Sequence, residues 1–441
     1  MSQPGLFADL EMRGIIKQST DPKLGGVLAR EKITVYAGFD PTADSLHIGH
    51  LLPLFTLRRF QDAGHRVIAV VGGATGLIGD PSFKAAERSL LTKDALAHNL
   101  RGITAAIRTI LKLDGPNPAL VVDNAEWFDG KRQRFSYLDF LRDVGKHFTI
   151  NHMLTKESVR GRLEDREHGI SYTEFSYMLL QAYDFYYLNR EEGCRLQIGG
   201  SDQWGNITAG CELIRRMHAA SDEAGARAGK HPEVYGLTFP LITKSDGTKF
   251  GKTESGAVWL DPAKTSPYRF YQFLLQTPDA DVMQLLKYFT FLGKAELDSL
   301  EASLKSEPEK RQAQNRLAQA LTAIVHGAEE VRKAEVASKA LFSEEIKDLD
   351  EAGLLSVLGE APSTTLPRTE LGQKTLVDLL VDTKLCASKG AAKKDLLAGG
   401  IYVNNARVND PAAVVASTMT IAGKFVVLRK GKKNYHLVTF K

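Results

Sequence analysis

The feature of this sequence that most constrains its fold is an alternation of short apolar runs and helix-like segments between residues 30 and about 260. Four such runs, each followed by a loop and a segment of helical periodicity, are KITVYAG, RVIAVVGG, ALVVDN and CRLQIGG. This alternation is typical of a parallel sheet covered by helices, in which ligands bind at the carboxyl ends of the strands. We therefore expect an α/β domain over residues 1–261 with its site at that edge.

The rest of the chain divides into a helical part and a small mixed part. Residues 262–358 show helical periodicity throughout, which predicts an α-helical domain. GEAPSTTLPRTE is rich in Pro, Ser and Thr, so we interpret residues 359–369 as a linker. The pattern of residues 370–441 predicts two short helices and then strands, with Asn404 and Asn405 as a tight turn, in an α+β domain.

Charge is segregated along the chain. From Leu366 to Lys441 there are 13 Lys and Arg against 5 Asp and Glu, a net charge of +8, whereas the other 365 residues carry 44 against 48. A basic terminal domain suits contact with a polyanion, although a solvated surface would explain the same charge. The three cysteines form no CxxC pair and no apolar stretch reaches 18 residues, so we expect a cytoplasmic protein with no structural zinc or other metal site and no membrane span.

The stretch YAGFDPTADSLHIGHLLPLFTLRRF carries two histidines three residues apart where a strand leads through a loop into a helix. Asp44 or Ser45 could cap that helix, which would place His47 and His50 in its first turn beside free N–H groups that attract anions. Gly49 removes a side chain where an adenine ring could lie, and the imidazoles can donate to phosphate oxygens. Two histidines alone are more often packed or solvated, so a second motif is needed.

That second motif is KFGKT, which places Lys249 and Lys252 in a loop that Gly247 and Gly251 can hinge. DGTKFGKT is not a P-loop, because three residues rather than four separate the two glycines, and VVGGATGLIGD lacks the first glycine of a dinucleotide fingerprint. Together with HIGH, KFGKT indicates ATP bound without a P-loop. If a bound ATP reacts at this site, His47, His50, Lys249 and Lys252 can stabilise the negative charge that develops on its phosphate oxygens, together with Mg²⁺.

The sequence resembles class I aminoacyl-tRNA synthetases, whose signatures are HIGH and a KMSKS loop, here KFGKT. It is more closely similar to the bacterial-type tyrosyl-tRNA synthetase family through YAGFDPTADSLHIGH, GGATGLIGDPS, YTEFSYMLLQAYDF and QIGGSDQWGNITAG. The basic terminal part resembles the S4-type RNA-binding domain of that family. Over nearly the whole chain the resemblance implies a Rossmann-like catalytic domain, a helical anticodon-side domain and an S4-like domain.

The resemblance also implies substrates and site residues. It implies activation of L-tyrosine with ATP and transfer of tyrosine to the 3′ end of tRNA(Tyr). The residues implied for tyrosine are Tyr36 and Asp184 at the phenolic hydroxyl, Asp80, Tyr177 and Gln181 at the ammonium, and Gln203 at the carboxylate. Those implied for ATP are Gly38, Asp40, His47, Gly49, His50, Asp202, Lys249, Lys252 and Thr253.

Spacing supports part of this assignment, because Tyr177, Gln181 and Asp184 lie at i, i+4 and i+7 on one helix face, where Gln and Asp are poor core residues. For tRNA we single out Lys389, Lys393 and Lys394 at a helix start. The resemblance further implies a homodimer, for which FSYLDFLRDVGKHF could supply an apolar interface.

Some alternatives remain open at this level. Lys84 and Arg88 could help to bind pyrophosphate or be ordinary surface cations. A non-catalytic RNA-binding protein with the same body is opposed by the intact HIGH and KFGKT motifs. A tryptophan enzyme is disfavoured by Tyr36 and Asp184, because an indole offers one donor and no acceptor.

Overall fold

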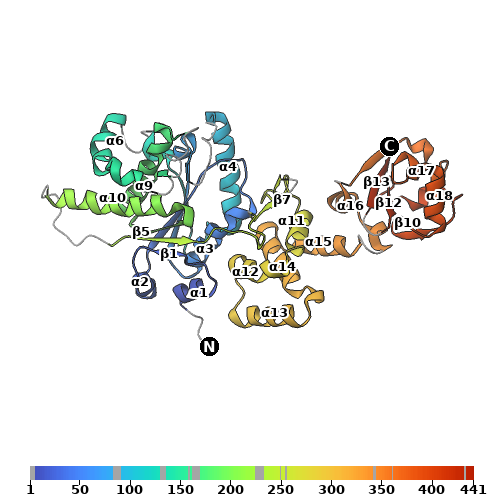
Figure 1. The fold of residues 1–441 in the computed structure, drawn as a ribbon, viewed down its shortest axis with the longest axis horizontal. Coiled ribbons are helices and arrows are strands. Elements are labelled where there is room, and N and C mark those ends of the chain that lie inside the picture. Colours follow the sequence, from blue (N-terminus) through green and yellow to red (C-terminus); the bar gives the residue numbers. More distant parts are fainter. Residues whose placement is uncertain are drawn as a thin grey trace. The chain divides into compact units, whose positions relative to one another are not determined.

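A computed structural model of the chain describes residues 5–82, 91–129, 136–156, 159–160, 169–223, 233–248, 250–253, 256–340, 344–359, 361–431 and 434–441. The chain divides into two compact units (Figure 1). Unit 1 comprises Met1–Lys264 and Thr277–Leu317, and unit 2 comprises Thr265–Gln276 and Ala318–Lys441. Within the described segments, no helix is long and apolar enough to cross a membrane.

Unit 1 is built on a six-stranded sheet with the strand order β1-β6-β5-β2-β3-β4. The strands are β1 (Gln18–Ser19), β2 (Thr34–Phe39), β3 (Arg66–Val71), β4 (Leu120–Asp123), β5 (Cys194–Gly200) and β6 (Tyr235–Phe239). All neighbours pair in parallel except β1 and β6. The four predicted strands are thus confirmed as β2, β3, β4 and β5, and β6 is a further parallel strand. The chain order reverses between β2 and β5, which opens a crevice at their carboxyl ends.

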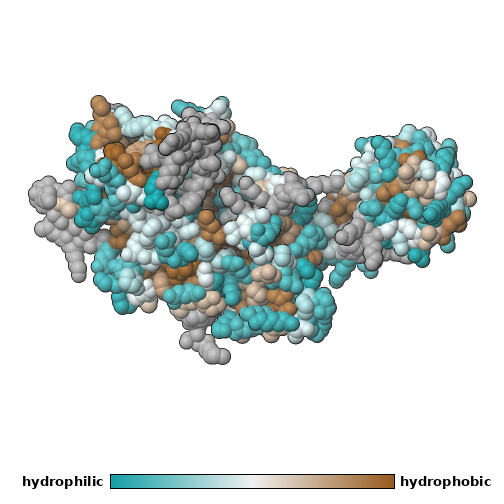
Figure 2. All heavy atoms as spheres, in the orientation of Figure 1, coloured by the Kyte–Doolittle hydropathy of each residue, from teal (hydrophilic) through white to brown (hydrophobic). Residues whose placement is uncertain are grey.

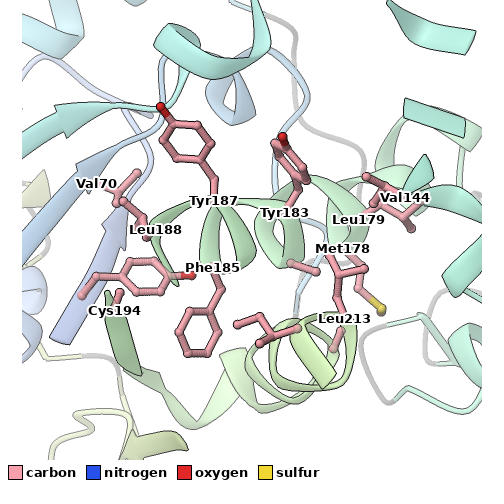
Figure 3. Packing of buried hydrophobic residues seen from close by; sticks show 14 of the residues in the cluster. Val70, Val144, Met178, Leu179, Tyr183, Phe185, Tyr187, Leu188, Cys194 and Leu213 are labelled. Carbon is pink, nitrogen blue, oxygen red and sulfur yellow. The ribbon is translucent and has the colours of Figure 1, made fainter. Parts of the chain in front are cut away.

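The helices of unit 1 are α1 (Leu6–Met12), α2 (Leu24–Arg30), α3 (Leu51–Asp62), α4 (Lys93–Ile110), α5 (Ala125–Phe128), α6 (Tyr137–Asp143), α7 (Ile150–Leu154), α9 (Tyr172–Glu192), α10 (Trp204–Glu223), α12 (Asp279–Phe289), α13 (Lys294–Ser306) and the first part of α14 (Gln312–His326), whose remainder belongs to unit 2. Helix α3 packs on β2 and β3, whereas α9 and α10 pack on each other and on β5. Large buried side chains project from several sides of α9, with Tyr183 and Tyr187 on one side and Phe185 on the other (Figure 3). Because its apolar residues are not confined to one stripe, the helix is buried on more than one face.

The turn before α3 differs from the expectation in its capping residue. A short 3₁₀-helix, η1 (Ile48–His50), leads into α3, and its cap is His47, whose Nδ1 accepts the backbone N–H two residues later at 3.0 Å. Asp44 is instead ion-paired with Lys264 at 2.6 Å, and the Ser45 hydroxyl donates to a neighbouring carbonyl. Neither of the two predicted caps is therefore available to the helix.

The helical segment predicted over residues 262–358 is helical, but its helices are divided between the two units. Helix α12 belongs to unit 1 because the buried guanidinium groups of Arg13 and Arg59 donate to backbone carbonyls at its carboxyl end, including that of Thr290 at 3.2 and 2.6 Å. These bonds satisfy carbonyls that a helix end leaves without an intrahelical partner. Burial lowers the pKa of Arg59 to about 9.

Unit 2 contains α11 (Pro267–Leu275), α15 (Ala328–Ala340), α16 (Glu351–Leu358), α17 (Leu376–Asp382) and α18 (Lys389–Leu397). Its five-stranded sheet has the order β11-β10-β12-β13-β9, with β9 (Ser363–Leu366), β10 (Ile401–Val403), β11 (Ala406–Val408), β12 (Phe425–Lys430) and β13 (Asn434–Phe440). Side chains of α17 and α18 share a core with one face of this sheet, and those of α16 share a second core with the other face.

Two local predictions for unit 2 have different outcomes. The turn at Asn404 and Asn405 is confirmed, because both have positive φ (47° and 62°) between β10 and β11. Part of the predicted linker, Ser363–Leu366, instead forms β9, which pairs in parallel with β13. Its Ser- and Thr-rich sequence shows no apolar alternation, and its partner strand lies far later in the chain.

Candidate active site

A cavity of about 340 Å³ lies in unit 1 at the carboxyl ends of β2, β3, β5 and β6. It is lined by eleven of the residues that the sequence singled out: Tyr36, Gly38, Asp40, Gly49, His50, Asp80, Tyr177, Gln181, Asp184, Asp202 and Gln203. They come from β2, the turn before α3, the segment after β3, helix α9 and the end of β5. The fold therefore brings residues from five separate segments to one cavity at the predicted sheet edge.

Asp184 is held in a buried position by two donors. Nδ2 of Asn124 donates to one carboxyl oxygen at 3.1 Å, and Nε1 of Trp127 donates to the other at 2.9 Å. Burial raises the pKa of Asp184 to about 8, although these two hydrogen bonds oppose the shift. A fixed carboxyl group at the wall of a cavity can recognise a hydroxyl group of a bound molecule.

The hydroxyl of Tyr36 is buried and has no hydrogen-bond partner among the described residues. Its pKa is raised well above the ordinary value by burial and then by the nearby Asp184. A buried hydroxyl without a partner is costly in an empty pocket. A polar ligand group that reaches Tyr36 and Asp184 would supply the missing bond.

A hydrogen-bond chain connects Asp40 to Asp184. Asp40 accepts a bond from the Tyr177 hydroxyl at 2.8 Å and another from the Thr75 hydroxyl at 2.9 Å. Nδ2 of Asn124 donates to the Thr75 hydroxyl at 2.9 Å and also to Asp184. Each member limits the rotation of the next, so the chain fixes both carboxylates relative to one another.

A second chain runs along the opposite wall. Nε2 of Gln203 donates to Asp80 at 2.7 Å. Nδ2 of Asn206 donates to the side-chain oxygens Oε1 of Gln181 and Gln203 at 3.1 and 3.2 Å. Asp80, Gln181 and Gln203 are the residues that the resemblance implies for the ammonium and carboxylate of an amino acid. Here a carboxylate and two amides are held in one network at the cavity surface.

The two histidines are both oriented by backbone N–H groups. Nδ1 of His47 accepts from the Gly49 N–H at 3.0 Å, and Nδ1 of His50 accepts from the His47 N–H at 3.2 Å. Their rings lie 3.9 Å apart. Because Nδ1 accepts in each ring, the neutral tautomer carries its proton on Nε2. Burial and the neighbouring His47 lower the pKa of His50 to about 3, so His50 is a neutral N–H donor at physiological pH.

Gly49 has a local reason to lack a side chain. A Cβ at this position would lie 2.8 Å from Cε1 of the His47 ring, so any other residue would displace the imidazole from its capping position. Gly49 also lines the cavity.

The KFGKT segment packs against the histidine turn. The Ile48 N–H donates to the Val258 carbonyl at 2.9 Å, and the Val258 N–H donates to the Gly251 carbonyl at 3.0 Å. The ring of Phe250 is buried and stacks on Phe289 at 5.9 Å between centroids. The two motifs, separated by some 200 residues in the sequence, are therefore neighbours in the fold.

Not every predicted residue can be placed. Lys252 and Thr253 form β7, which pairs with β8 (Gly256–Ala257). Lys249 lies outside the described residues, as do Lys84 and Arg88. In unit 2, Lys389 begins α18 and is ion-paired with Asp378 at 2.7 Å, whereas Lys393 and Lys394 are exposed on the same helix.

Sequence reasoning missed the residues that orient the site, namely Asn124, Trp127, Thr75 and Asn206. Asn124 follows β4 directly, so the expectation of ligands at strand ends could have suggested it. The glycines after β3 have a steric role, because a Cβ at Gly72 would collide with Asp40 and one at Gly73 would collide with Asp123.

Known proteins match this architecture. A family model described as "tRNA synthetases class I (W and Y)" matches residues 28–343, and a model of the "Tyrosine--tRNA ligase SYY-like C-terminal domain" matches residues 356–438. The chain is 52% identical over 437 residues to the tyrosine–tRNA ligase of Bacillus velezensis, covering 99% of each chain. It is 50% identical over 437 residues to that of Geobacillus stearothermophilus, again covering 99% of each chain.

Solved structures agree with this relationship. The crystal structure of a C-terminally truncated mitochondrial tyrosyl-tRNA synthetase from Aspergillus nidulans is 30% identical, with a TM-score of 0.69, and covers 77% of this chain and 95% of that chain. The first family model spans more than half of the chain, and the sequence relatives match over nearly their full length. The chain therefore belongs to the class I tRNA synthetases of the tryptophan and tyrosine family.

Proposed function

We propose that the protein activates L-tyrosine with ATP, forming tyrosyl-adenylate and pyrophosphate, and then transfers tyrosine to the 3′ end of tRNA(Tyr). The observation that carries the choice of amino acid is the pair of polar groups at the buried wall of the cavity. The Tyr36 hydroxyl lacks a partner among the described residues, and Asp184 is fixed beside it by two donors. A phenol both donates and accepts a hydrogen bond, so it can satisfy both groups, whereas phenylalanine would leave them unpaired.

In this proposal the second wall binds the reacting end of tyrosine. The ammonium group needs a carboxylate and neutral acceptors, which Asp80, Tyr177 and Gln181 supply. Gln203 can donate to the substrate carboxylate when it exchanges its bond with Asp80. The substrate carboxylate is ionised at pH 7, so it can attack the α-phosphate without a general base.

The nucleotide enters the proposed reaction as its Mg²⁺ complex, in which the ion is bound mainly through the phosphates. Gly38, Asp40, Gly49 and Asp202 line the same cavity as His50. His47 and His50 present Nε2 donors, Lys252 and Thr253 belong to β7, which follows Gly251 beside the histidine turn, and the proposal also assigns Lys249, which lies outside the described residues, to ATP. Donors that meet phosphate oxygens as negative charge develops stabilise the transition state more than the ground state.

For tRNA, the proposal assigns the basic unit 2 a role in binding the polyanion. Lys393 and Lys394 are exposed on α18, and their sites suit phosphate contact. Lys389 is already paired with Asp378, so its contribution should be smaller than that of the other two.

We also propose that the protein is a homodimer through the apolar surface around α6 and α7. The exposed large hydrophobic residues of α6, α7 and the start of α9 are Tyr137, Leu138, Leu141, Ile150, Leu154 and Tyr172. Figure 2 shows hydrophobic, brown side chains in the region of α6. Leu138 is 74% exposed and Tyr172 is 63% exposed in the single chain. Such a patch is typical of a protein–protein interface.

Because ATP and tRNA are cytoplasmic substrates, the proposed reaction belongs in the cytoplasm.

The test of the proposed activity is amino-acid-dependent exchange of pyrophosphate into ATP, with tyrosine, phenylalanine and tryptophan compared at equal concentration. We expect exchange with tyrosine and only background exchange with the other two. Preferred exchange with tryptophan would overturn the assignment of Tyr36 and Asp184 as readers of a phenol. Tyrosine exchange without charging of tRNA(Tyr) would support activation but contradict the transfer step.

A further inference from the structure

One face of the sheet in unit 2 carries an alternating row of arginines and tyrosines, one from each of four neighbouring strands. The strand register places Arg407 of β11 opposite Tyr402 of β10, Tyr402 opposite Arg429 of β12, and Arg429 opposite Tyr435 of β13. We call these four residues the Arg–Tyr row. Directly opposed residues point to the same face of a sheet, so all four side chains share one face.

The side chains of the row contact one another in sequence. The Arg429 guanidinium lies 3.7 Å from the Tyr402 ring centroid and 5.8 Å from that of Tyr435, and the Arg407 guanidinium lies 6.0 Å from the Tyr402 centroid. Nε of Arg429 donates to Asn405 at 2.9 Å, and Nε of Arg407 donates to the Gly399 carbonyl at 2.8 Å. These ring contacts and hydrogen bonds therefore hold the arginine and tyrosine side chains in fixed orientations along the row.

The positive charge of the row is not neutralised within the described parts of the chain. Neither Arg407 nor Arg429 forms an ion pair there, whereas Lys389, Lys424 and Lys430 are each paired with a carboxylate. Arg407 is exposed and Tyr402 is partly exposed. The Arg407–Tyr402 end of the row thus combines planar groups accessible to a ligand with charge that no described carboxylate neutralises, whereas Tyr435 packs against the core beneath α16.

This combination fits one kind of partner. Aromatic rings next to arginines bind unpaired nucleotides, because bases stack on the rings and phosphates pair with the cations. A duplex offers its phosphates but keeps its bases stacked inside, so it would use only the cations. The terminal part of unit 2 is also basic, with a net charge of +8 over residues 366–441.

We propose that the Arg–Tyr row binds an unpaired nucleotide of the tRNA, with a base stacked on Tyr402 and the adjacent phosphate held by Arg407. This inference rests on the proposed function for its partner, and it adds a stacking site to the phosphate contacts expected from α18. Arg407 donates to Gly399, two residues after the end of α18, so the exposed end of the row lies near the carboxyl end of that helix. The body of α18 packs on the opposite face of the sheet, so the row is a contact separate from Lys393 and Lys394.

The experiment uses the full-length protein, with equilibrium binding of tRNA(Tyr) measured over a series of salt concentrations. Tyr402→Leu should weaken binding about 10-fold with an unchanged salt dependence, because stacking releases no counterions. Tyr402→Phe keeps the ring and should bind as the parent does. Arg407→Gln should lower the slope of log K against log salt by about 1, and Lys424→Gln should not, because Lys424 is already paired with Glu351.

Competition with short RNAs decides between unpaired and duplex partners. Single-stranded oligo(U) should displace tRNA from the parent protein and from Tyr402→Phe, but about 10-fold less well from Tyr402→Leu. The stacking site would be refuted if Tyr402→Leu bound tRNA and oligo(U) as tightly as the parent does. It would also be refuted if Tyr402→Leu lost as much affinity for a duplex RNA competitor as for oligo(U). If Tyr402→Leu fails to fold, Tyr402→Met decides, because methionine fills the space with a flexible side chain that has no ring, and full affinity for oligo(U) would then refute the proposal.

Tyrosine-dependent pyrophosphate exchange separates this inference from the proposed function, because it requires no tRNA. Every variant of the row should retain parental exchange. Absence of exchange in the parent would refute the proposed function and leave the binding result for oligo(U) as an independent test of the row.

Discussion

Nε1 of Trp127 donates a 2.9 Å hydrogen bond to Oδ1 of Asp184, although 57 residues separate them in the chain. Both side chains are almost fully buried. With Asn124 bonded to Oδ2, each carboxyl oxygen already has one donor and retains a lone pair for another. The carboxyl group is thus prepared to accept a hydrogen bond from a ligand without reorienting.

Asp184→Ala should reduce the preference for tyrosine over phenylalanine. Loss of the acceptor would leave a bound phenol unpaired in a desolvated site, at a cost of about 1–3 kcal/mol, while phenylalanine would lose nothing comparable. The measurement is kcat/KM in pyrophosphate exchange for the two amino acids. Trp127→Phe is the matched variant, because it keeps the carboxylate and removes one donor, and its effect should be smaller. An unchanged ratio in Asp184→Ala would mean that another group reads the hydroxyl.

The raised pKa of Asp184 predicts a specific dependence of stability on pH. Burial raises this pKa from 3.8 to about 8, so between these values the unfolded chain is ionised at Asp184 while the folded, ligand-free protein still holds the proton. Unfolding then releases a proton, so rising pH destabilises the folded state from about pH 4 until it passes 8. Asp184→Asn has no such proton. Its melting temperature relative to the parent should therefore rise across this range, and a constant difference would contradict the raised pKa.

The neutral state of His50 predicts the outcome of two substitutions. His50→Gln keeps an N–H donor near the position of Nε2 and should retain more adenylate formation than His50→Ala, which we expect to lose ~10²–10³-fold, as for removal of other transition-state donors. Since the pKa of His50 is about 3, the parent rate should show no inflection from this group between pH 5 and 8. Equal losses in the two variants would show that the N–H donor is not what matters.

The parts of this fold that sequence could predict are those whose signal is local. Strands β2 to β5 follow from apolar runs, and the turn at Asn404 and Asn405 follows from residues that tolerate positive φ. Strand β9 has no such signal, because its pairing with β13 depends on a partner far along the chain.

The residues of the candidate site also divide into those with a local sequence signal and those without one. HIGH and KFGKT are contiguous motifs that sequence reveals, and the spacing within α9 places three site residues on one face. Asn124, Trp127 and Asn206 act through contacts with side chains 25 to 60 residues away, which no local pattern encodes. The cap at His47 was missed because Asp44, the better capping residue by type, is engaged by Lys264.

Substitutions in the KFGKT segment should lower the rate of tyrosine activation rather than the affinity for tyrosine. Lys249→Ala and Lys252→Ala should each lower the rate of adenylate formation far more than the affinity for tyrosine, because charge develops only in the transition state. Phe250→Ala should have the same signature, since its ring anchors the segment on Phe289. Phe250→Leu should restore part of the rate by refilling that space. Stopped-flow measurement of adenylate formation separates the two quantities, and parallel losses in both would contradict this role.

A chain that ends at Ala340 should fold and form tyrosyl-adenylate but charge tRNA poorly. A cut near Leu355 would be a worse choice, because it would strand α16, whose Leu354 packs with Phe425 and Leu437 of the terminal sheet. Ending at Ala340 removes α16 together with that sheet and leaves the cavity of unit 1 complete.

The measurements for this truncation are pyrophosphate exchange, tRNA charging and the salt dependence of tRNA affinity. Exchange should match the full chain, because every described residue of the cavity lies before residue 242. Charging should fall, and the remaining affinity should depend less on salt, because the cations of α18 and the Arg–Tyr row no longer displace counterions from the RNA. Lys393→Gln with Lys394→Gln in the full chain should reproduce part of this change, whereas Lys389→Gln should do so less. Full charging by the truncated chain at ordinary salt would show that the remaining helices hold the tRNA without unit 2's sheet.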